Sequence, residues 1–268
     1  MKLFTQITPS LTRSASDVSL SAGKSDPYME AVTSGDMETA QRMVARRAAR
    51  TGYDKFGVVF RGQWGGEPQG VLRSFRASYS FGSEYAAKEY AAHPNDRNAP
   101  GSDTPKPAVM SVYLKIDNPF VDDGDDPFIG LSTIADKLGR DFALKTAIDF
   151  SECFTNTNNW IEDLQPELEK QGIQSYEQFI KERPDAAIES LYGDIFPMLD
   201  SHKFVERLRS VRIDGAIHGG AGLTDGETEW KTFSTNQVKL SDPVTYDKDK
   251  KPIPLNKRFD SSNPDIRY

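Results

Sequence analysis

An acidic pair at the start of an alternating run constrains this chain more than any other stretch. Glu227 and Glu229 stand two residues apart after a glycine-rich loop, and residues 229–235 then alternate. Alternation with period two predicts a β-strand with both glutamates on one face, and with Trp230 and Lys231 on opposite faces. Two carboxylates on one strand after such a loop predict a catalytic edge. A solvated strand end has the same pattern.

Composition limits the classes of protein to consider. The 268 residues suffice for one large domain or two small ones. The net charge of −7 argues against a general nucleic-acid binder but allows a local basic pocket for a phosphate. A single cysteine, Cys153, excludes an internal disulfide and a cysteine-based zinc site. The three histidines, His93, His202 and His218, are too scattered to predict a metal site.

The sequence predicts neither a secretory signal nor a membrane-spanning helix. Residues 1–23 lack the continuous apolar region of a secretory signal. No apolar run reaches the length that a membrane-spanning helix requires. We therefore expect a cytoplasmic protein that does not bind a membrane.

A second feature is an arginine at the end of an apolar run. Residues 56–62 predict a short buried strand that ends with Arg61 and Gly62. A buried arginine needs an anionic partner, and its planar fork suits a phosphate or a carboxylate. Gly62 would allow a ligand to approach the backbone closely. The alternative is an arginine that points into solvent.

A third feature is a hydroxyl-rich strand that leads into a helix. Ser78, Tyr79 and Ser80 lie in a strand-like stretch, and the alanine-rich residues 84–91 predict a helix with Ser83 as its N-cap. Hydroxyl groups at such a corner bond a ligand, orient a neighbouring carboxylate, or simply cap the helix.

The remaining segments give an α+β organisation. Residues 1–27 read as a flexible leader, residues 28–126 and 211–268 as one mixed core, and residues 127–210 as an all-α insert or lid. Asp36 is the predicted N-cap of a helix over residues 37–50, and residues 241–268 predict an extended tail. Five insert helices are predicted, over residues 132–144, 160–171, 175–181, 185–191 and 202–210. Strands are predicted over residues 108–116, 211–218 and 237–240.

The three motifs stand in the order of the ADP-ribosyltransferase fold of the arginine–serine–glutamate type. The chain resembles, in more detail, the ADP-ribosyltransferase modules of phage and mobile-element polyvalent proteins. The resemblance covers residues 28–126 and 211–268 and omits the helical insert. The matching segments are Ser80–Ala91, Val112–Val121 (VYLKIDNPFV), Asp214–Ile217 (DGAI), Glu229–Lys239 (EWKTFSTNQVK) and Asn263–Tyr268 (NPDIRY).

The resemblance implies a split β-sheet core and a toxin-like, NAD-dependent mono-ADP-ribosyltransferase that releases nicotinamide. Arg61, Gly62, Ser78, Tyr79 and Ser80 would bind NAD. Glu229 would stabilise the positive charge on the ribose during bond cleavage, and Glu227 would address the acceptor. In this family a glutamate at that second position accompanies transfer to arginine, so a host protein arginine is the favoured acceptor. No metal is needed.

Two departures from the family pattern leave alternatives open. Arg61 stands where many of these modules carry histidine, and Tyr79 replaces the middle threonine of a Ser-Thr-Ser element. Against the histidine–tyrosine–glutamate branch, Tyr79 would instead stack on nicotinamide. Two rival functions are a catalytically weak module that binds NAD or a protein, and a structural or delivery protein of a phage. A glycosidase is disfavoured, because Glu227 and Glu229 lie nearer than such pairs do across a sugar.

Overall fold

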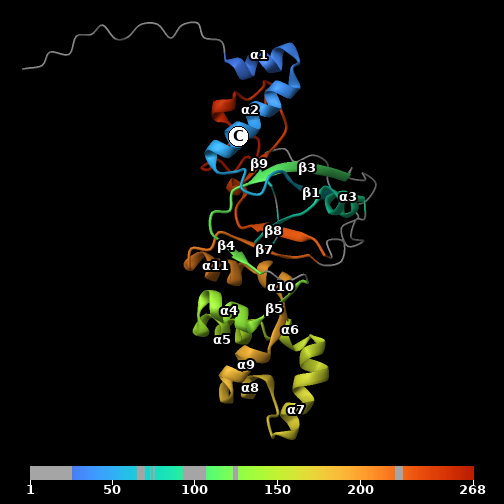
Figure 1. Ribbon diagram of the computed structural model, residues 1–268, viewed down its shortest axis with the longest axis vertical. Helices are drawn as coiled ribbons and strands as arrows, with labels where there is room; N and C mark the ends of the chain where they lie inside the picture. Colours follow the sequence, from blue (N-terminus) through green and yellow to red (C-terminus); the bar gives the residue numbers. More distant parts are fainter. Residues whose placement is uncertain are drawn as a thin grey trace, which may run out of the picture.

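The computed structural model describes residues 26–64, 70–72, 74, 76–92, 107–122, 126–220 and 226–268. The predicted α+β class is confirmed, since helices and several small sheets make up the chain. The molecule is elongated, with two N-terminal helices at one end, the sheets in the middle and the insert at the other end (Figure 1). Residues 1–25 of the predicted leader lie outside the described residues. No described helix has the length and apolar character needed to cross a membrane.

The first sheet has three antiparallel strands in the order β1-β3-β9, with β1 at Val59–Trp64, β3 at Pro107–Leu114 and β9 at Val238–Leu240. The predicted strand over residues 56–62 begins only at Val59. Gly57 has φ +69°, a left-handed conformation that ends extended backbone before β1.

The second sheet has four strands in the order β2-β8-β7-β4. Their bounds are Tyr79–Phe81 for β2, Thr228–Thr232 for β8, Gly215–Gly219 for β7 and Pro119–Val121 for β4. β4 and β7 are parallel, and the helical insert lies between them in the chain. The backbones of Phe60 and Gly82 exchange two hydrogen bonds of 3.0 and 2.9 Å, which join the two sheets.

One apolar cluster lies between the sheets. Val59 and Met110 of the first sheet contribute to it, and so do Phe81 and Trp230 of the second. The predicted alternation along β8 is confirmed, because Trp230 packs in this cluster while Lys231 contacts Glu229 and the insert. The face of β8 that carries Glu229 is therefore the one directed away from the first sheet.

The N-terminal helices pack against the C-terminal segment. The helices are α1 (Pro27–Ser34) and α2 (Met37–Thr51), and Asp36 accepts a hydrogen bond from the Thr39 backbone as the predicted N-cap. The fully buried Arg258 donates to the Leu240 carbonyl at 2.9 Å, and Lys239 donates to the carbonyls of Asn263 and Asp265. The tail is mostly non-helical, and residues 258–265 of it are hydrogen-bonded to β9 of the first sheet.

The insert departs from the predicted all-α subdomain. Strands β5 (Phe128–Gly130) and β6 (Tyr192–Asp194) form a small antiparallel sheet within it. The predicted helix over residues 132–144 is two helices, because Gly139 adopts φ +94° between them. The helices are α4 (Leu131–Leu138), α5 (Arg140–Asp149), α6 (Ser151–Thr155), the π-helical turn η2 (Asn159–Leu164), α7 (Gln165–Lys170), α8 (Tyr176–Glu182), α9 (Pro184–Ser190), α10 (Ile195–Leu199) and α11 (His202–Ser210). The helix predicted over residues 202–210 coincides with α11.

Helix α3 (Glu84–Ala92) lies against β1 at Gly62, and Ser83 caps it as predicted. A Cβ added to Gly62 would lie 2.0 Å from the carbonyl oxygen of Ala87.

We therefore expect Gly62→Ala to lower the free energy of unfolding by about 2–3 kcal/mol through overpacking, measured by urea denaturation. Gly130→Ala is the control, because its nearest neighbour is the Ser132 hydroxyl, a side-chain group that can rotate away. Equal destabilisation of both variants would contradict this role for Gly62.

Candidate functional site

Arg61 and the hydroxyl-rich strand meet where the two sheets join. The Arg61 Nη1 donates to the Ser80 carbonyl at 2.9 Å, and the guanidinium lies 5.9 Å from the Phe81 ring centroid. Its buried Nε has no acceptor among the described residues. Burial lowers the pKa of Arg61, while nearby Tyr90, Tyr79 and Glu229 act in the opposite direction. The guanidinium is thus a desolvated cation, and it has a donor left for an anionic ligand.

Gly62 has a different role from the one its position suggested. Sequence reasoning assigned it to ligand approach. In the structure α3 occupies that space, with the backbone of Ala87 and Ala91 within 3.0 Å of an added Cβ. The absence of a side chain at Gly62 therefore serves helix–sheet packing.

The three hydroxyl residues do not face the same way. Tyr79 packs at the edge of the cluster between the sheets, and its hydroxyl donates to the Leu72 carbonyl at 3.4 Å. Burial raises the pKa of Tyr79. Ser80 lies directly opposite Lys231 in the β2–β8 pair, so both side chains are on the face that carries Glu229. The buried Ser78 Oγ has no hydrogen-bond partner among the described residues. Ser80, and not Tyr79, shares the face of the glutamate.

Glu229 and Lys231 form a buried ion pair on β8. The Lys231 Nζ lies 3.4 Å from Glu229 Oε1 and 3.5 Å from Oδ1 of Asp200, which follows α10 in the insert. It also lies 4.8 Å from the centroid of the Phe196 ring. Lys231 is 1% exposed and Glu229 is 5% exposed. The predicted catalytic glutamate is therefore buried, and it shares its counter-ion with Asp200 of the insert.

Asp200 makes further contacts that fix the insert to the core. Its carboxylate is 2.6 Å from the guanidinium of Arg76, and its carbonyl accepts from the Ala77 backbone at 3.2 Å. The residues before β2 are thus connected to the insert. Sequence reasoning missed Lys231 and Asp200. The alternation that placed Lys231 beside Glu229 was a usable signal for the lysine, whereas no local pattern marks Asp200.

His218 is the cross-strand partner of Glu229 in the β7–β8 pair. Its Nδ1 lies 2.7 Å from the Gly219 carbonyl, and its Nε2 has no partner among the described residues. The ring contacts Phe196 edge-on at 4.8 Å. Burial lowers the pKa of His218, opposed by Glu229 and the Gly219 carbonyl. His218 is thus buried with one ring nitrogen hydrogen-bonded. His202 is exposed, and His93 lies outside the described residues.

Glu227 lies just before β8 and is not part of the strand. Its carbonyl accepts from the Gly220 backbone at 2.8 Å, which closes the β7–β8 connection. Its Oε2 is buried without a partner among the described residues. The shared face of Glu227 and Glu229 stays a prediction, as does the acceptor role of Glu227.

The side chains gathered here include groups that can contact a nucleotide. Within the described ranges no three His, Cys, Asp or Glu side chains cluster to hold an ion. The site offers a desolvated guanidinium, serine hydroxyls and a buried carboxylate. These groups match a diphosphate, ribose hydroxyls and a developing positive charge. No family model, no curated protein and no solved structure matches this chain.

The Lys231 ion pair leads to a stability prediction. Lys231→Met leaves the Glu229 and Asp200 carboxylates without their shared cation, and we expect a loss of about 3 kcal/mol in urea unfolding. The control is Lys203→Met, because Lys203 pairs with Asp149 at an exposed position. That variant should change stability by less than about 1 kcal/mol. Adding Glu229→Gln to Lys231→Met should recover part of the loss, and strictly additive losses would contradict the coupling.

The His218 environment leads to a pH prediction. The fold holds the imidazole neutral at a pKa below the ordinary value of 6.5, so unfolding takes up a proton once the pH falls below about 6.5. The free energy of unfolding should therefore decrease between pH 7.5 and pH 5.5. His218→Gln should show a smaller decrease in the same urea titrations, while the exposed-site control His202→Gln should follow the wild type. Identical profiles for all three proteins would contradict this assignment.

Proposed function

We propose that the protein is an NAD-dependent mono-ADP-ribosyltransferase that modifies a protein side chain and releases nicotinamide. The observation that carries the proposal is the buried Arg61 guanidinium on β1, which donates to the Ser80 carbonyl on β2, next to the strand β8 that carries the buried Glu229. The order of these motifs and the adjoining VYLKIDNPFV and NQVK segments support the ADP-ribosyltransferase-like split-sheet fold.

The proposed chemistry assigns one task to each group. Arg61 binds the NAD diphosphate through its remaining guanidinium donors, since a charge-assisted hydrogen bond is strongest in a desolvated site. Glu229 accepts a hydrogen bond from a ribose hydroxyl and stabilises the oxocarbenium-like charge as the nicotinamide–ribose bond breaks. Ser78 and Ser80 orient Glu229. The bond electrons leave with nicotinamide, and the acceptor nitrogen then bonds to the ribose carbon and loses a proton.

Glu227 is the proposed contact with the acceptor. A carboxylate before β8 pairs with an incoming guanidinium and takes its proton, which favours arginine as the modified residue. The proposed setting is the cytoplasm of a host cell, with NAD and a host protein as partners and no metal, nucleic acid or membrane.

A specific observation favours a second candidate, a module that binds NAD or a protein but transfers weakly. Glu229 is 5% exposed, and its counter-ion Lys231 is also bound by Asp200 of the insert. A nucleotide reaches the carboxylate only if the surrounding residues move. An insert that stays closed would give binding near Arg61 without turnover.

The test is incubation of the purified protein with biotinylated NAD and a host-cell lysate, together with an assay of nicotinamide release. Glu229→Gln should lower nicotinamide release about 100- to 1000-fold, because a preorganised charge at the transition state is lost. Glu227→Gln should release nicotinamide but label proteins poorly. The exposed-site control Glu206→Gln on α11 should match the wild type.

The outcomes separate the two candidates. Labelling that disappears in Glu229→Gln establishes the transferase. Wild-type protein that binds NAD in calorimetry yet releases no nicotinamide favours the binding module. Absence of NAD binding by the wild type, or equal binding by Arg61→Met, would contradict the site itself.

A further inference from the structure

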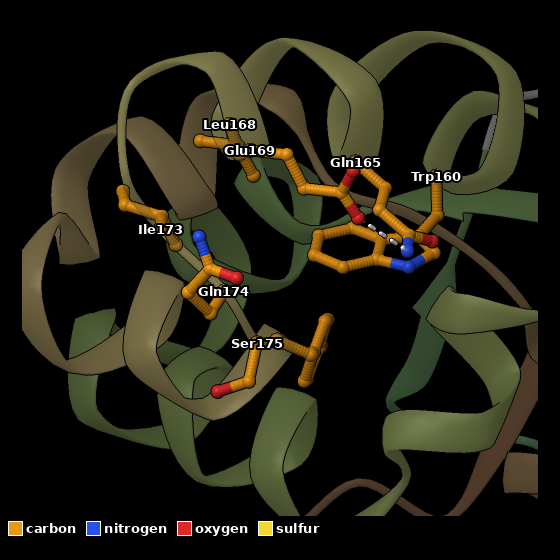
Figure 2. Close-up of a pocket in the computed structure, with 8 residues that line it drawn as sticks. Trp160, Gln165, Leu168, Glu169, Ile173, Gln174 and Ser175 are labelled. Carbon is orange, nitrogen blue, oxygen red and sulfur yellow. Dashed lines mark hydrogen bonds between the residues drawn. The ribbon is translucent and has the colours of Figure 1, made fainter.

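The far end of the insert carries a pocket beside the π-helical turn η2, remote from the two larger sheets (Figure 1). Its volume is about 150 Å³, and it opens to solvent through exposed polar side chains. π-helical turns occur often at functional sites. The lining residues are Trp160, Gln165, Leu168, Glu169, Ile173, Gln174, Ser175 and Tyr176 (Figure 2).

The indole of Trp160 is held in one orientation within this pocket. Tyr176 meets it edge-on at 5.0 Å between ring centroids, and Phe179 packs at 6.2 Å. Trp160 is 6% exposed and is one of the residues that line the pocket. A fixed aromatic surface attracts a cation through the negative potential over its ring face.

A carboxylate lies next to that aromatic surface. Gln165 donates through Nε2 to Glu169 Oε1 at 3.0 Å, and Figure 2 shows this pair beside the indole. The hydrogen bond restrains the Glu169 side chain without neutralising its charge. The exposed amide of Gln174 lies across the pocket. The pocket thus combines an aromatic surface, a charged acceptor and neutral polar groups.

The surrounding segment has a strong charge of one sign. Residues 152–189 contain nine acidic and three basic residues, a net charge of −6, compared with −7 for the whole chain. Of the three basic residues, Lys170 pairs with Glu167, and Arg183 is hydrogen-bonded to Gln171. The local field therefore attracts cations and disfavours anions.

We propose that this pocket binds an arginine side chain of a partner polypeptide. A guanidinium is flat and weakly hydrated, and it stacks on an indole while donating to a carboxylate, which a lysine ammonium does less well. A cavity of about 150 Å³ accommodates benzene, which is larger than a guanidinium group. This binding is independent of NAD and of Glu229.

The test is an NMR titration of the full chain with an acetylated, amidated Gly-Gly-Arg-Gly-Gly peptide, monitored at the indole N–H signals. Trp160→Phe assigns the Trp160 signal. We expect this signal to shift and saturate with the arginine peptide. The same peptide with citrulline, which is neutral but nearly isosteric, should bind at least about threefold more weakly.

Matched variants test the pocket itself. Glu169→Gln should weaken the arginine peptide at least about threefold, while Glu189→Gln should bind like the wild type, because Glu189 is exposed on α9 and does not line the pocket. Both variants remove one exposed negative charge, so neither should affect folding. Glu229→Gln should also bind like the wild type.

Three results would overturn the proposal. The first is the absence of a saturable shift at Trp160. The second is equal binding of the citrulline peptide. The third is equal weakening by Glu169→Gln and Glu189→Gln, which would indicate diffuse attraction by the acidic segment in place of a pocket.

Discussion

The buried ammonium of Lys231 is the contact on which the arrangement around Glu229 depends. It lies between the Glu229 carboxylate on β8 and the Asp200 carboxylate of the insert, at 3.4 and 3.5 Å. Two carboxylates near one another repel, and a desolvated lysine is costly without partners. The ammonium is therefore stabilised by both carboxylates, and Asp200 also pairs with Arg76. One of the two contacts that stabilise Lys231 on the predicted catalytic strand thus comes from a segment that the resemblance to ADP-ribosyltransferases does not cover.

Local patterns in the sequence predicted much of the fold. The Asp36 cap, the alternation that separates Trp230 from Lys231, and the helix at α11 follow from side-chain spacing within a few residues. The break at Gly139 and the β5–β6 pair did not follow, because one depends on a backbone conformation and the other joins residues 62 or more positions apart. The same limit applies to the site. Arg61 and Glu229 were predicted from their own strands, whereas Asp200 comes from a different segment and has no signature of its own.

Burial of Glu229 has two consequences for the proposed chemistry. Exclusion of water strengthens the interaction of the carboxylate with a developing positive charge and protects an activated ribose from hydrolysis. Burial also means that part of the protein must move before a substrate can reach the Glu229 carboxylate. The contacts between the insert and the core differ in how easily they separate. Ion pairs such as Arg76 with Asp200 regain hydration when they separate, whereas the apolar cluster around Phe120, Ala216 and Phe233 does not. Opening is therefore less costly at the segment around Asp200 than by separation of the whole insert from the second sheet.

The two ends of the insert respond differently to ionic strength. At the far end, the charges of residues 152–189 are mostly exposed, and salt screens their attraction for a cationic partner within about 10 Å at 0.1 M. At the near end, Lys231 and Glu229 are buried, so salt weakens their attraction much less. Moderate salt should therefore weaken partner recruitment while leaving the closed arrangement over Glu229 intact. In the proposed scheme, the insert carries an arginine-binding pocket at one end and the Asp200 carboxylate that shares the counter-ion of Glu229 at the other, so its physical role extends beyond that of a passive lid.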